Sequence, residues 1–229
     1  MAETADEPLR HLIRLEPAFV PLITRFGPPR LTPRRESPYE ALLRAIAHQQ
    51  LHGRAAEAIL GRLAARCGGR LPDPATLAAL PETDLRAIGF SQSKIAALKD
   101  LAAKATAGVV PSRQAAARLS DEALVARLTG LRGVGRWTVE MLLIFTLGRP
   151  DVLPVDDFGI REGWRHLTGA ALQPRPRALA EWGAPFAPFR TTVSWYLWRL
   201  ADEAKRIRPP AAEAPKGRGD AQPGASRKS

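Results

Sequence analysis

The segment LRGVGRW, residues 131–137, decides how this chain is interpreted, because it joins two apolar segments that have helical periodicity. Its two glycines, Gly133 and Gly135, stand one residue apart and permit a tight turn that side chains would obstruct. Such a turn leaves backbone N–H groups free at the start of the next helix, where the helix dipole also favours an anion. It can therefore hold a DNA phosphate without reading a base. The alternative is that Gly133 only ends one helix and Gly135 starts the next.

Helical periodicity extends over the chain on both sides of this segment. Apolar residues recur at helical spacing in residues 8–26, 37–50 and 136–147, and no sustained alternation typical of strands is present. A further helix is expected to begin near Asp156 or Asp157. The sequence therefore predicts an all-α fold.

Composition limits the class of protein. A chain of 229 residues with 45% hydrophobic and 25% charged residues is typical of a globular protein. It contains no apolar run near the roughly 20 residues that a membrane helix needs, and its acidic N-terminus does not resemble a secretory signal. Cys67 is the single cysteine, which excludes an intrachain disulfide or a four-cysteine iron–sulfur cluster and favours a cytoplasmic location.

The net charge of +11 points to a polyanionic partner such as nucleic acid. Part of this charge lies on residues 205–229, which carry seven basic and two acidic residues. Residues 209–229 are predicted to form a disordered basic tail that adds salt-sensitive affinity for DNA. A solvated surface rich in arginine is the alternative explanation of the charge.

Two adjacent carboxylates, Asp156 and Asp157, follow the second hairpin helix. A carboxylate at the start of a helix can face the sugar of a nucleotide that has left the base stack. There it can activate water or stabilise the positive charge that develops on the sugar as the base leaves. An aspartate before a helix is also an ordinary N-cap, so one of the two can cap while the other catalyses.

The hairpin LRGVGRW followed by Thr138 resembles that of the helix–hairpin–helix (HhH-GPD) DNA glycosylases, in particular the alkylbase branch of 3-methyladenine DNA glycosylase II. Four other segments resemble that family in order and spacing, and the similarity covers about residues 39–200. These are the corner at 45–56, the turn at 89–94, the Asp-Asp pair and the aromatic segment from Trp182 to Trp198. The length is that of the compact, yeast-like form without an N-terminal β domain.

The resemblance implies a fold and a reaction. It implies two packed helical subdomains, roughly 37–130 and 131–208 plus the N-terminal helix, with the active-site cleft between them. It favours Asp157 as the catalytic carboxylate, although alignment with the oxidised-guanine branch selects Asp156. Trp137 occupies the position of the lysine that bifunctional relatives use to cut the strand. No lysine lies between residues 104 and 205, so water is expected to be the nucleophile and an abasic site the product.

The resemblance also implies the contacts with DNA. Gln50 or Leu51 would fill the gap left by a flipped base, and His52 would contact the minor groove. Other groups expected to contact DNA are Ser91, Lys94, Arg132, Gly133, Val134, Gly135 and Arg161. The base pocket is expected to contain Trp137, whose ring can stack on a cationic alkylated purine, with Trp182 and Phe189. No cofactor and no side-chain metal ligands are expected, although a monovalent cation can bind the hairpin carbonyls in this family.

Three functional hypotheses follow from the sequence. The first is a monofunctional hydrolase that removes alkylated purines of the 3-methyladenine and 7-methylguanine type. The second is a helix–hairpin–helix protein that binds DNA without catalysis, and the third is a glycosylase for uracil, hypoxanthine or oxidised bases. The expected partner is damaged double-stranded DNA. We expect a monomer that needs no protein partner or membrane and works in the cytoplasm, at the nucleoid in a bacterium.

Overall fold

A computed structural model describes residues 3–207, all of them in helices, turns and loops and none in a strand. The predicted all-α class is thereby confirmed, whereas the predicted basic tail lies outside the described residues. Within residues 3–207, none of the helices combines the length and the apolar character that crossing a bilayer would require.

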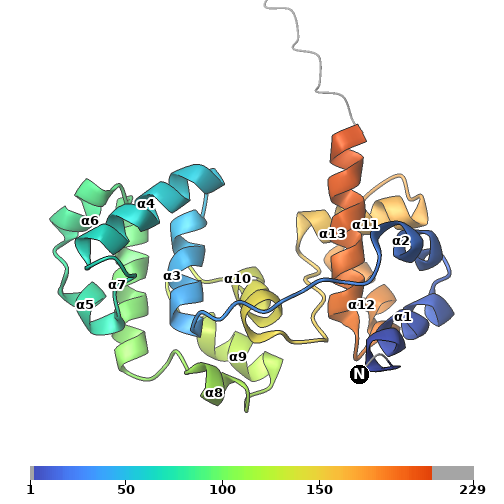
Figure 1. The fold of residues 1–229 in the computed structure, drawn as a ribbon, viewed down its shortest axis with the longest axis horizontal. Coiled ribbons are helices and arrows are strands. Elements are labelled where there is room, and N and C mark those ends of the chain that lie inside the picture. The colour runs from blue at the N-terminus through green and yellow to red at the C-terminus, as the bar shows by residue number, and fades with distance from the viewer. Residues whose placement is uncertain (1–2, 208–229) are drawn as a thin grey trace, which may run out of the picture.

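The helices form two lobes joined by an extended segment (Figure 1). The first lobe contains α3 (Pro38–His48), α4 (Gly53–Arg66), α5 (Pro74–Ala79), α6 (Glu82–Ile88), α7 (Gln92–Thr106), α8 (Arg113–Ala116), α9 (Asp121–Leu128), α10 (Arg136–Leu142) and the π-helical turn η1 (Leu143–Leu147). The second lobe contains α1 (Glu3–Leu15), α2 (Phe19–Phe26), α11 (Phe158–Thr168), α12 (Pro176–Gly183), the 3₁₀ turn η2 (Ala184–Phe186) and α13 (Arg190–Ile207).

Each lobe has its own hydrophobic core, and the two cores correct the predicted boundary between subdomains. The hairpin helix α10 buries Val139 and Leu142 in the first core, where α10 packs against α3 and α9. The second core begins at Leu153 in this part of the chain and includes the N-terminal helices. The boundary therefore falls near residue 152 rather than 130, because the apolar face of α10 is covered by the helices that precede it.

The N-terminal segment forms two helices instead of the single helix expected over residues 8–26. Pro17 lacks a backbone N–H and disfavours helical geometry at the residue before it, so the chain turns between α1 and α2. Leu12 and Phe19, one from each helix, are fully buried in the second core. The N-terminal residues thus complete the lobe that contains the C-terminal helix.

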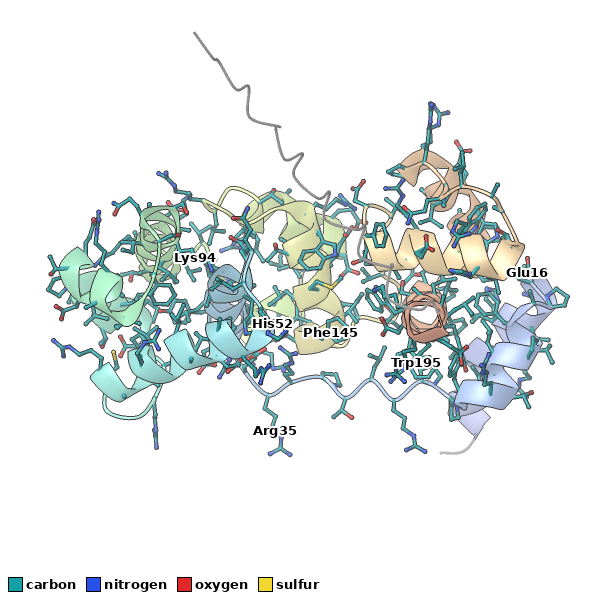
Figure 2. All side chains as sticks on the ribbon, turned by 90° about the horizontal axis from the view of Figure 1, so that it is seen from above. Glu16, Arg35, His52, Lys94, Phe145 and Trp195 are labelled. Atoms are coloured by element: carbon teal, nitrogen blue, oxygen red, sulfur yellow. The ribbon has the colours of Figure 1, made fainter. Side chains whose placement is uncertain are left out.

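The segment at residues 27–37 crosses from the second lobe to the first (Figure 1). The Tyr196 hydroxyl donates to the carbonyl of Gly27 (2.8 Å) at one end, and the amide of Arg34 donates to the carbonyl of Phe145 (2.8 Å) at the other. Arg35 projects from this segment away from the lobes (Figure 2). Leu31 and Trp198 pack against both cores, so they connect the lobes at the junction where the candidate site lies.

Helix α3 starts as predicted but ends two residues earlier. Its N-cap Ser37 forms a capping box with Glu40, and Pro38 occupies the first helical position. The expected helix reached residue 50, whereas α3 stops at His48. Gln50 has a φ of 55° and is the one non-glycine residue with positive φ among the described residues. The corner between α3 and α4 is therefore a tight turn that holds Gln50 in an unfavourable conformation.

Candidate active site

Asp157 lies at the junction of the lobes and accepts hydrogen bonds on both carboxylate oxygens. Oδ1 accepts from the backbone N–H of Ile160 (2.9 Å), which makes Asp157 the N-cap of α11, and from the indole N–H of Trp198 (2.9 Å). Oδ2 accepts from the indole N–H of Trp137 (2.7 Å). Asp157 is half-buried, whereas Asp156 is exposed. Asp157 is therefore both the cap of α11 and the carboxylate that the two indole N–H groups bind at the junction of the lobes.

Helix packing leaves little freedom to this carboxylate. Gly159 lies so close to it that an added Cβ would be 3.0 Å from Trp198 Cδ1 and 3.1 Å from Asp157 Oδ1. A side chain at residue 159 would compete for that space. Glycine here lets the start of α11 approach α13, which brings the Trp198 indole within hydrogen-bond distance of the carboxylate.

Two tryptophans from different lobes hold the carboxylate, and only one was foreseen. Trp137, in the first turn of α10, remains 49% exposed and lines a cavity. Trp198, on α13, stacks on Phe145 with ring centroids 5.7 Å apart and 28° between the planes. Trp198 was named from the sequence only as the end of an aromatic segment and was given no role at the site. Residues 157 and 198 are far apart in the chain, so helical spacing alone carries no signal of their contact.

A cavity of about 550 Å³ opens beside Trp137. It collects residues from three segments predicted to face DNA: Gln50 from the corner, Ser91 and Lys94 from the start of α7, and Trp137 from α10. The full lining is Ala45, His48, Gln49, Gln50, Ser91, Ser93, Lys94, Trp137, Thr138 and Met141. The structure therefore brings together segments that the sequence identified separately.

A second cavity of about 530 Å³ adjoins the first. The two have four residues in common, Ala45, His48, Thr138 and Met141, and the second extends to Phe145. Because Phe145 stacks on Trp198, this cavity leads from the corner toward the partner of the Asp157 carboxylate. Figure 2 shows Phe145 on the side of the first lobe that faces the second.

The corner exposes the residues that were expected to enter the DNA. Leu51 is 40% exposed, and Gln50 and His52 are exposed beside it. His52 occupies the N-cap position of α4 without forming a side-chain capping bond, so its imidazole is not committed to the helix.

The hairpin has the predicted glycine geometry, but two of its backbone N–H groups, those of Arg132 and Val134, are already used within the protein. Gly133 has a φ of 76°, and Gly135 is the N-cap of α10. Val134 is only 4% exposed and uses its N–H within the turn, toward the carbonyl of Leu131 (3.1 Å). The backbone N–H of Arg132 likewise donates to Asp100 Oδ2 (2.7 Å). The exposed glycines and the first turn of α10 remain as the surface that can face a phosphate.

Protein groups already use several hairpin carbonyls. The ammonium of Lys104 donates to the carbonyl of Gly130 (2.6 Å), and the side-chain amide of Gln49 donates to that of Gly133 (2.7 Å). A monovalent cation at the hairpin would have to use other carbonyls of the turn. Among the described residues, no cluster of three His, Cys, Asp or Glu side chains is arranged to hold a metal ion.

Two expected pocket aromatics lie elsewhere. Trp182 packs edge-on against Trp164 and lies 4.8 Å from Phe186, between ring centroids, in the core of the second lobe. Phe189 contacts His11 of α1 in the same lobe. Neither lines the cavities beside Trp137. Their placement among the base-pocket residues is corrected, because Trp182 packs against α11 and η2 and Phe189 packs against α1.

Two expected DNA-binding cations are used inside the protein. The Lys94 ammonium donates to the carbonyl of Ala47 (2.7 Å), and burial lowers the pKa of this lysine. The Arg161 guanidinium donates to the carbonyl of Pro174 (2.9 Å). Both cations thus bind backbone segments of the protein, and because a carbonyl is neutral these bonds do not neutralise their positive charges.

An ion pair on α10 joins the exposed side chain of Arg136 to the buried carboxylate of Glu140. Glu140 is 5% exposed, and its carboxylate accepts from Arg136 Nε (3.0 Å). Burial raises the pKa of Glu140 despite the arginine, and the negative charges of Asp156 and Asp157 raise it further. This i,i+4 pair holds the Arg136 side chain along the helix.

Sequence comparison identifies the class of protein that this fold and site define. Residues 43–183 match the family described as HhH-GPD superfamily base excision DNA repair protein, and the chain belongs to this family. The predicted family membership is therefore confirmed.

Individual relatives have the same architecture. DNA-3-methyladenine glycosylase 1 of Schizosaccharomyces pombe is 44% identical over 83% of this chain and 85% of its own. The structure of the 3-methyladenine DNA glycosylase of that organism in complex with abasic DNA superimposes with a TM-score of 0.75, at 41% identity over 84% of this chain and 95% of the other. The crystal structure of a DNA-3-methyladenine glycosidase from Bacillus halodurans superimposes with a TM-score of 0.80. The sequence identity is 29%, and the match covers 87% of this chain and 91% of the other.

Replacement of Trp198 by phenylalanine tests the role of its N–H group. Trp198→Phe keeps an aromatic ring against Phe145 but removes the hydrogen bond to Asp157 Oδ1. A hydrogen bond to a charged group contributes on the order of 2 kcal/mol, so we expect base excision to slow by about tenfold or more under single-turnover conditions. Far-UV circular dichroism and the melting temperature serve as controls for folding. An unchanged rate would show that the Trp198 N–H does not support the carboxylate.

Proposed function

We propose that this protein is a DNA repair glycosylase that removes alkylated purines, of the 3-methyladenine and 7-methylguanine type, from duplex DNA. The observation that carries the proposal is the Asp157 carboxylate, held by two indole N–H groups at the lobe junction, beside a glycine hairpin. The names of the relatives at 44% and 29% identity support the same substrate class.

The reaction is hydrolysis of the N-glycosidic bond. As the bond breaks, positive charge develops on the deoxyribose, and the Asp157 carboxylate stabilises it or activates the attacking water. A purine alkylated on a ring nitrogen is cationic and already a good leaving group, so one carboxylate is sufficient assistance. The exposed face of Trp137 offers a stacking surface for such a cation.

We propose that the enzyme leaves an intact strand with an abasic site. Strand cleavage by a glycosylase needs an amine that forms a Schiff base. Trp137 fills the position that a lysine would need, and the chain has no lysine between residues 104 and 205. Lys94 lines the cavity beside Trp137, but its ammonium is held by the carbonyl of Ala47. Water is then the nucleophile.

DNA is the partner in this proposal, and the abasic-DNA complex of the relative at 41% identity supports it. Gly133 and Gly135 hold the backbone of the damaged strand, while Gln50 or Leu51 fills the space of the flipped base. We further propose that the enzyme acts as a monomer in the cytoplasm, without a cofactor, membrane contact or obligate protein partner.

A substrate panel tests this function. Single-turnover base release would be measured on duplexes that carry 7-methylguanine, 3-methyladenine, hypoxanthine, uracil or an oxidised guanine. We expect release of the methylated purines to be fastest. Release confined to uracil, hypoxanthine or the oxidised base would replace the proposed substrate class, and tight binding without release of any base would favour a non-catalytic DNA-binding protein.

A further inference from the structure

The corner and the hairpin, two segments far apart in the sequence, are joined by one side chain. Gln49 is the C-cap of α3. It is also the first residue of the turn at residues 49–52, the part of the corner that lies between α3 and α4. Its Nε2 donates to the carbonyl of Gly133, in the hairpin at residues 131–135, over 2.7 Å. Gln49 is half-buried and also lines the cavity beside Trp137.

Both ends of this hydrogen bond lie next to backbone of unusual conformation. Gln50, the next residue after Gln49, has a φ of 55°, and Gly133 has a φ of 76°. A Cβ on Gly133 would be 3.8 Å from Gln49 Oε1 and 3.4 Å from Ala97 Cβ, so the hairpin turn rests directly against Gln49 and α7. A non-glycine residue with a positive φ, such as Gln50, keeps this conformation only where the surrounding structure stabilises it. Gln49 is the adjacent group that provides such a hold.

The rest of the corner is fixed independently. Lys94 Nζ donates to the carbonyl of Ala47, within the last turn of α3 (2.7 Å), and the amide of Leu51 donates to the carbonyl of His48 (3.2 Å). Loss of the Gln49 hydrogen bond would therefore free the corner from the hairpin without releasing α3. For this reason the role of Gln49 can be separated from folding.

We propose that Gln49 is a positioning residue that couples two contacts with DNA: insertion of the corner into the base stack, and binding of the DNA backbone by the hairpin. This inference rests on the proposed function. A side chain that fills the place of a flipped base must resist the tendency of the base to return to the stack. It can do so only if the corner is fixed relative to the strand, and the hairpin is the part of the protein that holds that strand. The hydrogen bond from Gln49 to Gly133 fixes the position of the adjacent Gln50 relative to the hairpin.

A comparison of paired and unpaired lesions tests the coupling. Gln49→Met keeps the length of the side chain but removes the donor. Single-turnover release would be measured from a duplex with 7-methylguanine opposite cytosine, and from the same strand with the lesion opposite a tetrahydrofuran abasic analogue. The second lesion has no pairing partner, so its extrusion needs less assistance.

We expect Gln49→Met to slow release of the paired lesion by roughly fivefold to tenfold, the factor that corresponds to one lost hydrogen bond. Release of the unpaired lesion should change by less than about twofold, because extrusion of such a base costs least. 2-Aminopurine placed next to the lesion should also brighten less on binding of the variant to the paired duplex. Gln114→Met, which makes the same change on the exposed side of α8, serves as the matched control.

Equal slowing on both substrates would overturn the proposal, because it would show a general structural defect. An unchanged rate on the paired lesion would overturn it as well. If the wild-type protein released no base at all, the proposed function would fail instead. The 2-aminopurine signal of the bound duplexes would then still decide whether Gln49 supports extrusion.

Discussion

Asp157→Asn should reduce base release by roughly a thousandfold, within the range that a positioned carboxylate contributes to such a reaction. Asparagine keeps the size of the side chain and is an equally good N-cap, so α11 should still begin at residue 158. It lacks the negative charge that opposes the positive charge on the sugar. The rate would be measured under single-turnover conditions, with DNA affinity measured in parallel and expected to remain within a few-fold.

Asp156→Asn provides the matched control for that experiment. Asp156 is the adjacent residue with the same side chain, but it is exposed and lies outside the arrangement of the two indoles. We expect its rate to remain close to that of the wild type. A large loss in Asp156→Asn with little change in Asp157→Asn would transfer the catalytic role to Asp156 and contradict the account.

Gly163→Ala should destabilise the protein by about 3 kcal/mol or more, because an added methyl group would overpack a rigid backbone contact. Gly163 is buried in α11, and a Cβ there would overlap the backbone carbonyl of Leu197 on α13. Neither helix can move away without also moving Asp157 from Trp198. Thermal unfolding should show a decrease in melting temperature of roughly 10 °C for a chain of this length.

Gly61→Ala makes the same change where there is space. Gly61 lies within α4, and an added Cβ there would meet no atom within 4 Å. Alanine is favoured over glycine inside a helix by about 1 kcal/mol, so this variant should unfold at a slightly higher temperature than the wild type. If both variants were destabilised alike, close packing of α11 on α13 would not be the cause.

Local sequence signals were sufficient to predict the helices and most of their ends. Ser37 caps α3 at the start of the helix predicted for residues 37–50, and Asp157 caps α11 where a helix was expected to begin. The exceptions arose where local rules compete. Apolar spacing alone joined the N-terminal segment into one helix, but Pro17 divides it into two. The expected helix at residues 37–50 ends instead at His48, because Gln50 adopts a positive φ that is not helical.

The candidate site was predicted in part. The hairpin glycines and the Asp156–Asp157 pair could be located because each lies in a short segment with its own physical signature, whereas Trp137 and the choice of Asp157 came from the family resemblance. Trp198, and the burial of Trp182 away from the cavities, depend on how α13 packs against α11 and α12, which no short segment specifies. Lys94 and Arg161 were assigned to DNA through the family resemblance, whereas in the fold each also donates to a backbone carbonyl of the protein.

The product formed by the wild-type protein tests the central claim most directly. A duplex with one 7-methylguanine would be incubated with excess protein, and the strand analysed with and without hot alkali, and with borohydride to trap any Schiff base. The account predicts release of free 7-methylguanine and a strand that breaks only after alkali, with no trapped covalent complex. Strand cleavage without alkali and a borohydride-trapped adduct would contradict hydrolysis by water at Asp157 and would point to a lysine nucleophile such as Lys94.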